Sequence, residues 1–147
     1  MRHGFLTLEF SDDGDGTGRL DVEGEADGYS GRSHAYINKD EIKRVAVALS
    51  QYPLPQSHGC SLSGGFGKSR GSPAQEHVGI DAYPVNRRGY IGMQVRMATA
   101  VWSETRPESQ SIVQLEIVTT YEPLARFSKD LLAMLDGTAS VATLEGE

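Results

Sequence analysis

The segment DGDGTGRLDVEG, residues 13–24, carries oxygen-bearing side chains at the spacing of an EF-hand calcium loop. Positions 1, 3 and 5 of such a loop are occupied here by Asp13, Asp15 and Thr17. An EF-hand also needs a helix on each side and a bidentate glutamate at position 12. Position 12 is Gly24, and both flanks alternate as strands do, so the sequence favours a solvated turn over a calcium site.

Cys60, His77 and Asp81 could supply the parts of a cysteine-dependent enzyme: a nucleophile, its general base and the group that orients the base. His77 and Asp81 are four residues apart in a segment with strand periodicity, so they share one face. The sequence places no helix N-terminus at Cys60 to lower its thiol pKa, and a small buried thiol is the commoner role. A hydrolase or transferase using Cys60 and His77 is therefore the alternative to a non-catalytic function.

The segment GGFGKSRG, residues 64–71, ends like the phosphate-binding loop of a nucleotide-binding protein. That loop also needs a glycine where this chain has Leu62, and a helix directly after its last residues. Loop-forming residues follow instead, so we expect a contact loop rather than a nucleotide site. The side chains expected to contact a partner are two basic residues of this loop and three aromatic anchors: Lys68, Arg70, Tyr29, Phe66 and Trp102.

An acidic stripe runs along the second predicted strand, at every other position: Asp21, Glu23, Glu25 and Asp27. Alternate residues of a strand lie on one face, and like charges on one face most often form a solvated sheet surface. Nothing nearby in the sequence indicates a saccharide-binding enzyme that would use such carboxylates. Arg96 and Glu116 fall on the polar faces of neighbouring strands, and we expect a cross-strand ion pair between them.

The 147 residues carry a formal net charge of −6, which argues against a nucleic-acid partner because binding to phosphates needs clustered Lys and Arg. The single cysteine excludes an intramolecular disulfide and fits a reducing compartment. No signal-peptide pattern begins the chain, and no stretch approaches the roughly 18 apolar residues that span a bilayer. We therefore expect a cytoplasmic monomer or homodimer without a membrane or nucleic-acid partner.

Hydrophobic periodicity divides the chain into strands and two helices. The strands are expected at 4–10, 19–27, 33–37, 60–62, 77–83, 90–102 and 112–121. The first helix has Asn38 as its N-cap and ends before the prolines at 53–55. The second helix carries its apolar stripe over residues 124–135. Residues 138–147 are expected to be a frayed tail or a short edge strand.

The resulting order, β-β-β-α-β-β-β-β-α, predicts the α+β class. Consecutive strands with short connections form hairpins, so the sheet should be mainly antiparallel. We expect one sheet of about six to seven strands with both amphipathic helices packed on one face. No linker interrupts this pattern, and residues 1–147 are expected to form a single domain.

A succession of segments resembles a group of small bacterial domains without assigned activity. These segments are GRLDVEGEADGYSG, YPLP, LSGGFG, EHVGIDAYP, GMQVRMATAVW and TTYEPLARFSKDLLAML, and the resemblance covers most of residues 4–137. It implies a bacterial, cytoplasmic α+β protein, with a loose similarity to immunity proteins that neutralise toxins. It implies no functional residues.

The sequence therefore predicts a non-catalytic binding or protein-interaction domain. The incomplete catalytic motifs, the acidic charge and the long glycine-rich loops all favour this function over an enzyme. The expected partner is another protein, of basic charge, that meets the acidic sheet face or the loop at 57–72. No cofactor and no metal are expected.

Overall fold

The first three strands form a meander that two short turns hold together. They are β1 (Phe5–Asp12), β2 (Thr17–Ala26) and β3 (Tyr29–Asn38). Asp27 and Gly28 alone connect β2 to β3, with φ angles of 54° and 86°. Two consecutive positive φ angles are typical of the tight turns that match the twist of a hairpin. The sequence prediction that broke the chain at 28–31 and began the third strand at 33 was therefore wrong.

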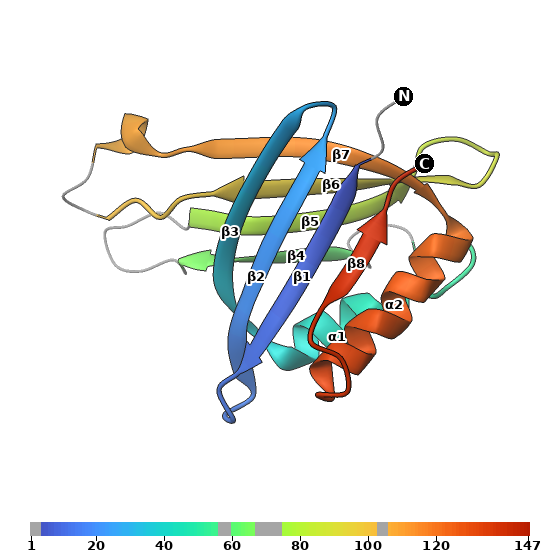
Figure 1. Cartoon of the computed structure of the whole chain (residues 1–147), viewed down its shortest axis with the longest axis horizontal. Helices are drawn as coiled ribbons and strands as arrows, with labels where there is room; N and C mark the ends of the chain where they lie inside the picture. The colour runs from blue at the N-terminus through green and yellow to red at the C-terminus, as the bar shows by residue number, and fades with distance from the viewer. Residues whose placement is uncertain (1–3, 56–59, 67–74, 103–105) are drawn as a thin grey trace.

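A computed structural model describes residues 4–55, 60–66, 75–102 and 106–147, and it divides the strands between two sheets (Figure 1). Sheet A has the order β3-β2-β1-β8, where β8 is Ala142–Glu145. Sheet B has the order β4-β5-β6-β7, with bounds Ser61–Phe66, Gln75–Pro84, Tyr90–Ala98 and Ile112–Thr120. A short 3-10 helix, η1 (Pro107–Ser109), lies between β6 and β7. Every strand pair is antiparallel.

The α+β class and the antiparallel pairing are confirmed, whereas the single sheet of six to seven strands was wrong. The chain leaves sheet A at the end of β3, passes through a helix, and starts sheet B at β4. β3 and β4 lie against each other through side chains, Ile37 and Ala35 facing Gly64. Periodicity shows which face of a strand is buried, but it does not show which strands share hydrogen bonds, so it could not separate the two sheets.

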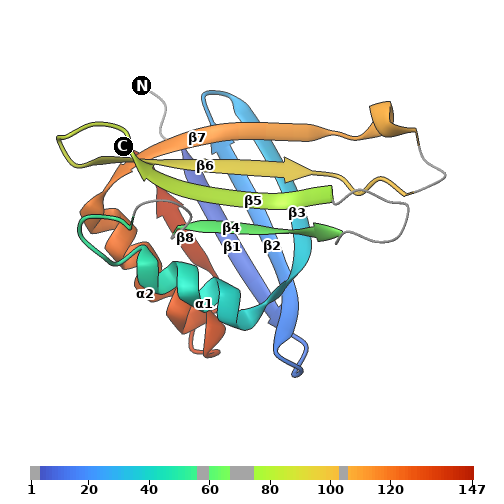
Figure 2. The same ribbon diagram turned by 180° about the vertical axis from the view of Figure 1, so that it is seen from behind.

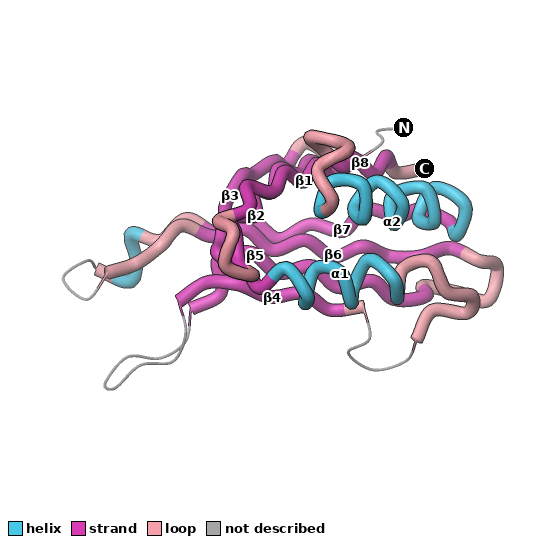
Figure 3. Tube along the Cα trace, turned by 90° about the horizontal axis from the view of Figure 1, so that it is seen from below, coloured by secondary structure: helices cyan, strands magenta, loops and turns pink. Residues whose placement is uncertain are grey.

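The two helices fill the space that the sheets leave open at one end. α1 (Lys39–Ala48) begins where the Asn38 side chain accepts a hydrogen bond from the Asp40 amide at 2.8 Å, as the predicted cap requires. α2 is Tyr121–Leu135. The helices lie side by side (Figures 2 and 3), and Ser128 donates a buried hydrogen bond to the carbonyl of Ala46 at 2.5 Å. They pack against both sheets, mainly at the edge strands β3, β4, β7 and β8 and also at β1, rather than on one face of a single sheet.

One hydrophobic core joins both sheets and both helices. It contains fully buried side chains from each layer, including Leu6, Leu20, Val78, Met93, Ile117 and Phe127. The alternation predicted for the second strand is confirmed, because Leu20, Val22 and Ala26 are all buried. None of the described helices is long and apolar enough to cross a membrane.

Glycines set the distance between the sheets where β3 crosses sheet B. A Cβ atom on Gly64 of β4 would lie 2.6 Å from Cγ1 of Ile37 and 3.0 Å from Cβ of Ala35. A Cβ atom on Gly31 of β3 would lie 3.0 Å from Cβ of Val113 on β7. Both contacts join the inner faces of the two sheets, so the sheets approach more closely than two layers of full side chains allow.

We predict that Gly64→Ala lowers the free energy of unfolding by about 1–3 kcal/mol, because the added methyl group overpacks the contact with Ile37. Gly24→Ala is the matched control, since a Cβ there meets nothing closer than 3.5 Å. It should change stability by less than about 0.5 kcal/mol or raise it, because alanine loses less chain entropy than glycine on folding. Urea unfolding of both variants measures this, and equal stabilities would contradict the proposed contact.

Candidate protein-interaction site

Three aromatic rings meet at the end of sheet B that extends past β3 (Figure 1). Phe66, the last residue of β4, lies 4.7 Å from the indole of Trp102, measured between ring centroids. The Phe66 ring also meets the imidazole of His77 edge to face, with 4.6 Å between the ring centroids. His77 is buried at 5% exposure, whereas the Trp102 side chain is 59% exposed. We call these three residues the aromatic cluster.

Gln75 fixes the segment that carries Trp102. Its side-chain amide donates to the carbonyl of Val101 at 2.6 Å and accepts from the Val101 amide at 3.1 Å. The same Gln75 oxygen lies 3.0 Å from Nε2 of His77, so the imidazole donates to it. The Gln75 side chain therefore supplies the hydrogen bonds that a neighbouring strand would give Val101. It also orients the imidazole of His77 and the backbone next to Trp102, the two residues whose rings contact Phe66. The backbone next to Trp102 is therefore held by hydrogen bonds, and the indole itself contacts Phe66.

An irregularity in the β4–β5 pairing turns His77 inward. Gly64 pairs with Val78, while the next residue, Gly65, pairs with Glu76, so His77 has no residue opposite it. The extra residue of such a bulge redirects the side chains around it. Gly65 makes the close approach, because a Cβ there would overlap the carbonyl oxygen of Gln75.

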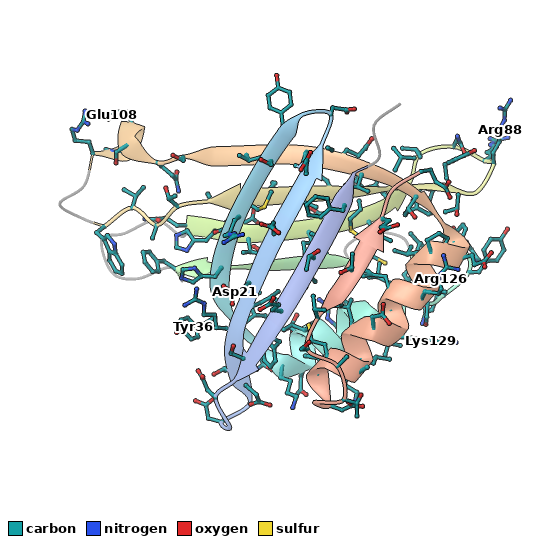
Figure 4. The ribbon with its side chains drawn as sticks, in the orientation of Figure 1. Asp21, Tyr36, Arg88, Glu108, Arg126 and Lys129 are labelled. Atoms are coloured by element: carbon teal, nitrogen blue, oxygen red, sulfur yellow. The ribbon has the colours of Figure 1, made fainter. Side chains whose placement is uncertain are left out.

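The environment of the cluster favours an uncharged imidazole. Burial lowers the pKa of His77 below its ordinary value of 6.5, and the nearby His34 lowers it further. His34 belongs to β3, so the edge strand of sheet A borders the cluster. Tyr36, also on β3, is exposed and lies near the end of sheet B that carries the cluster, as Figure 4 shows.

The predicted binding residues are only partly brought together. Phe66 and Trp102 are in contact, as a common surface requires. Tyr29 is 71% exposed at the β2–β3 turn, which is the other end of β3 from the residues that border the cluster. Lys68 and Arg70 lie outside the described residues. Sequence reasoning missed Gln75, because a glutamine beside a predicted strand carries no signal of a hydrogen bond to a segment 26 residues away.

The proposed cysteine-dependent triad is not assembled. The carbonyl of Cys60 accepts from the amide of Ala82, five residues beyond His77 on β5, which is about 16 Å along a strand. Burial raises the pKa of the Cys60 thiol above its ordinary value of 9.0, although Arg44 opposes this. Asp81 forms an ion pair with Arg96 at 2.5 Å.

The polar face of sheet B is organised around Arg96. Its guanidinium pairs with Glu76 at 2.6 Å and Asp81 at 2.5 Å, while Glu116 accepts from Tyr83 at 2.5 Å. The predicted ion pair between Arg96 and Glu116 was therefore wrong, since the bulge brings Glu76 to this face. Burial opposes ionisation of Glu76, but the hydrogen bonds from Arg96 and Ser63 outweigh it and hold its pKa below the usual range.

The aspartates of the β1–β2 turn bond to the turn itself. Asp15 accepts from both the amide and the hydroxyl of Thr17, at 3.1 and 2.7 Å, and these bonds lower the pKa of its carboxyl. Asp12 accepts from the amide of Gly14 and from Lys39, each at 2.8 Å. No group of three metal-ligating side chains comes together in the part of the chain that the structure describes. Asp27 lies in the β2–β3 turn, so the acidic stripe of β2 ends at Glu25.

Comparisons of this chain with protein-family models, with curated proteins and with solved structures find no match. The resemblance to small bacterial domains therefore stays a prediction, and the function is argued from the geometry of the chain itself.

We predict that Cys60 reacts slowly with a thiol reagent such as iodoacetamide in the folded protein at pH 7, because its side chain is buried and its pKa is raised. The same chain in urea should react at the rate of a free peptide thiol. Mass spectrometry of timed samples measures both rates. Equal rates in folded and unfolded protein would contradict a structural role and favour the cysteine-dependent enzyme.

Proposed function

We propose that this chain is a non-catalytic protein-binding domain whose contact surface centres on the exposed face of Trp102. The single observation that carries the proposal is an indole that is 59% exposed, contacts Phe66 and follows a backbone segment held by two hydrogen bonds between Gln75 and Val101. Tryptophan is the residue type most enriched among those that dominate binding energy at protein interfaces.

Fixing the indole before binding supports this function in energetic terms. Ordering a side chain at an interface costs roughly 0.5–1.5 kcal/mol, and a ring already held in place avoids much of this cost. Because Gln75 holds the backbone next to Trp102, the exposed face needs little rearrangement to meet a partner. An exposed apolar ring on a loop that meets only solvent would not need hydrogen bonds that hold its backbone in place.

The charge of sheet A supports a basic partner. Residues that lie directly opposite one another on neighbouring strands point to the same face of sheet A. The outer face defined in this way carries five carboxylates and two arginines: Glu9, Asp21, Glu23, Glu25, Glu145, Arg19 and Arg32. Arg19 pairs with Asp21 at 3.0 Å and Arg32 pairs with Glu23 at 2.5 Å, which leaves Glu9, Glu25 and Glu145 without an ion-pair partner among the described residues. Figure 4 shows Asp21 on this face, beside the strand that carries Tyr36. A negative face next to the aromatic cluster would steer a positively charged protein toward it.

We predict that Trp102→Ala weakens binding of the partner by about 30-fold or more, the effect of removing an interface residue worth roughly 2 kcal/mol. The partner is first isolated on immobilised wild-type chain from lysate of the source cells, and its affinity for each variant is then measured by calorimetry. Tyr90→Ala is the matched control, since it removes an exposed ring from the opposite end of the same sheet. It should leave affinity unchanged.

Two outcomes would contradict this proposal. A stoichiometric partner that binds Trp102→Ala as tightly as the wild type would place the interface elsewhere. Recovery of a small molecule and no protein, with that molecule converted on incubation, would favour an enzyme. Circular dichroism of Trp102→Ala separates lost binding from lost structure, and the fold should be unchanged because the indole is mostly exposed.

A further inference from the structure

We propose that the free edge of β8 and the adjoining face of α2 form a peptide-binding groove, in which an extended segment of another protein pairs with β8 and places an acidic side chain beside Lys129 and Arg126. This site lies at the opposite edge of sheet A from β3, so it does not depend on the surface around Trp102.

The backbone of β8 is ready to accept another strand. β8 pairs with β1 on one side only, with Leu6 opposite Leu144 and Leu8 opposite Ala142. The amide of Gly146 donates to the carbonyl of Gly4 at 2.7 Å. Since hydrogen-bonded pairs alternate in an antiparallel ladder, residues 142, 144 and 146 bond to β1 and residues 143 and 145 direct their N–H and C=O groups outward. Within the described part of the chain, these outward groups of β8 have no strand partner. The open edge ends at Glu145, because the amide of Glu147, on the same side, donates to the carbonyl of Val118 on β7 at 2.8 Å.

A groove of about 500 Å³ runs along this edge, between β8 and α2. One wall is the helix, where Arg126 and Lys129 lie one turn apart (Figure 4). The other wall is the strand edge, formed by Thr143 and Glu145. A strand edge facing a helix across a groove is the arrangement that peptide-binding domains use to add a strand, with main-chain bonds giving affinity and side-chain contacts giving specificity.

The charges of the groove select the side chains of that strand. Arg126 pairs with Glu122 at 3.0 Å on the helix surface, whereas Lys129 has no ion-pair partner among the described residues. The carboxylates of Asp130, Glu145 and Glu147 also line the groove. Glu145 projects to the outer face of sheet A, because its partner Phe5 does. Side chains of an added strand alternate between the two faces, so an acidic residue fits toward α2 and a basic residue fits beside Glu145.

The test selects random heptapeptides displayed on phage against the full chain and measures the enriched peptides by fluorescence anisotropy. Thr143→Pro removes the outward N–H of β8 and leaves the bonds to β1 intact, because residue 143 does not donate to β1. Thr143→Val is the matched control, since it keeps the N–H. Lys129→Glu reverses the charge of the helix wall at an exposed position.

We expect the enriched peptides to carry Asp or Glu within an extended sequence. Their Kd should be roughly three- to tenfold higher with Thr143→Pro than with Thr143→Val, the effect of one lost hydrogen bond. Lys129→Glu should raise Kd by about tenfold or more. If Thr143→Pro does not fold, the charge reversals Lys129→Glu and Arg126→Glu decide the outcome.

Three results would overturn the proposal: no peptide enriched over a selection on an unrelated protein, enriched peptides without an acidic residue, or affinities that none of these substitutions changes. A concentration-dependent dimer that Thr143→Pro abolishes would assign the edge to a second copy of the chain and would also overturn it. Loss of binding at Trp102 has no bearing on these results, so the two proposals fail separately.

Discussion

The close crossing of β3 over sheet B is the contact on which the rest of the structure depends. Gly64 and Gly31 remove the side chains that would hold the sheets apart, so Ile37 and Val113 meet the opposite backbone directly. The crossing places β3 over one part of sheet B and lets the ends of β4–β7 extend beyond it, while the helices close the other end (Figures 1 and 3). The aromatic cluster, with the exposed indole of Trp102, lies at the end of sheet B that extends past the crossing.

The end of sheet B that extends past β3 is not covered by sheet A. Hydrogen bonds between polar groups therefore hold this end in place instead of packing between two layers. Gln75 pairs with the backbone of Val101, and the bulge at His77 buries an imidazole against Phe66. Buried polar groups must find partners, and Gln75 supplies them for the backbone of Val101 and for the imidazole of His77. The result is an exposed indole whose ring contacts Phe66 and whose neighbouring backbone is held by Gln75, and the proposed binding function rests on this arrangement.

Local features were predictable from the sequence because local physics decides them. The burial of Leu20 and Val22 follows from alternation, and the cap at Asn38 from its position before an amphipathic segment. Features that depend on non-local pairing were not predictable. The division into two sheets, the pairing of Arg96 with Glu76 and the link from Gln75 to Val101 each join segments whose contact no periodicity encodes. The sequence predicted Phe66 and Trp102 as partner-binding aromatic residues, but it did not predict that their rings are in contact.

Trp102 is the only tryptophan of the chain, so it can report on binding directly. The most direct measurement is the fluorine NMR spectrum of chain labelled with 5-fluorotryptophan, recorded with and without the isolated partner. If the indole is ordered and lies at the centre of the interface, the free protein should give one sharp resonance. On binding, this resonance should shift, and its chemical shift should no longer depend on whether the solvent is H2O or D2O. An unchanged resonance in a saturated complex would show that the partner does not contact Trp102, and would contradict the account.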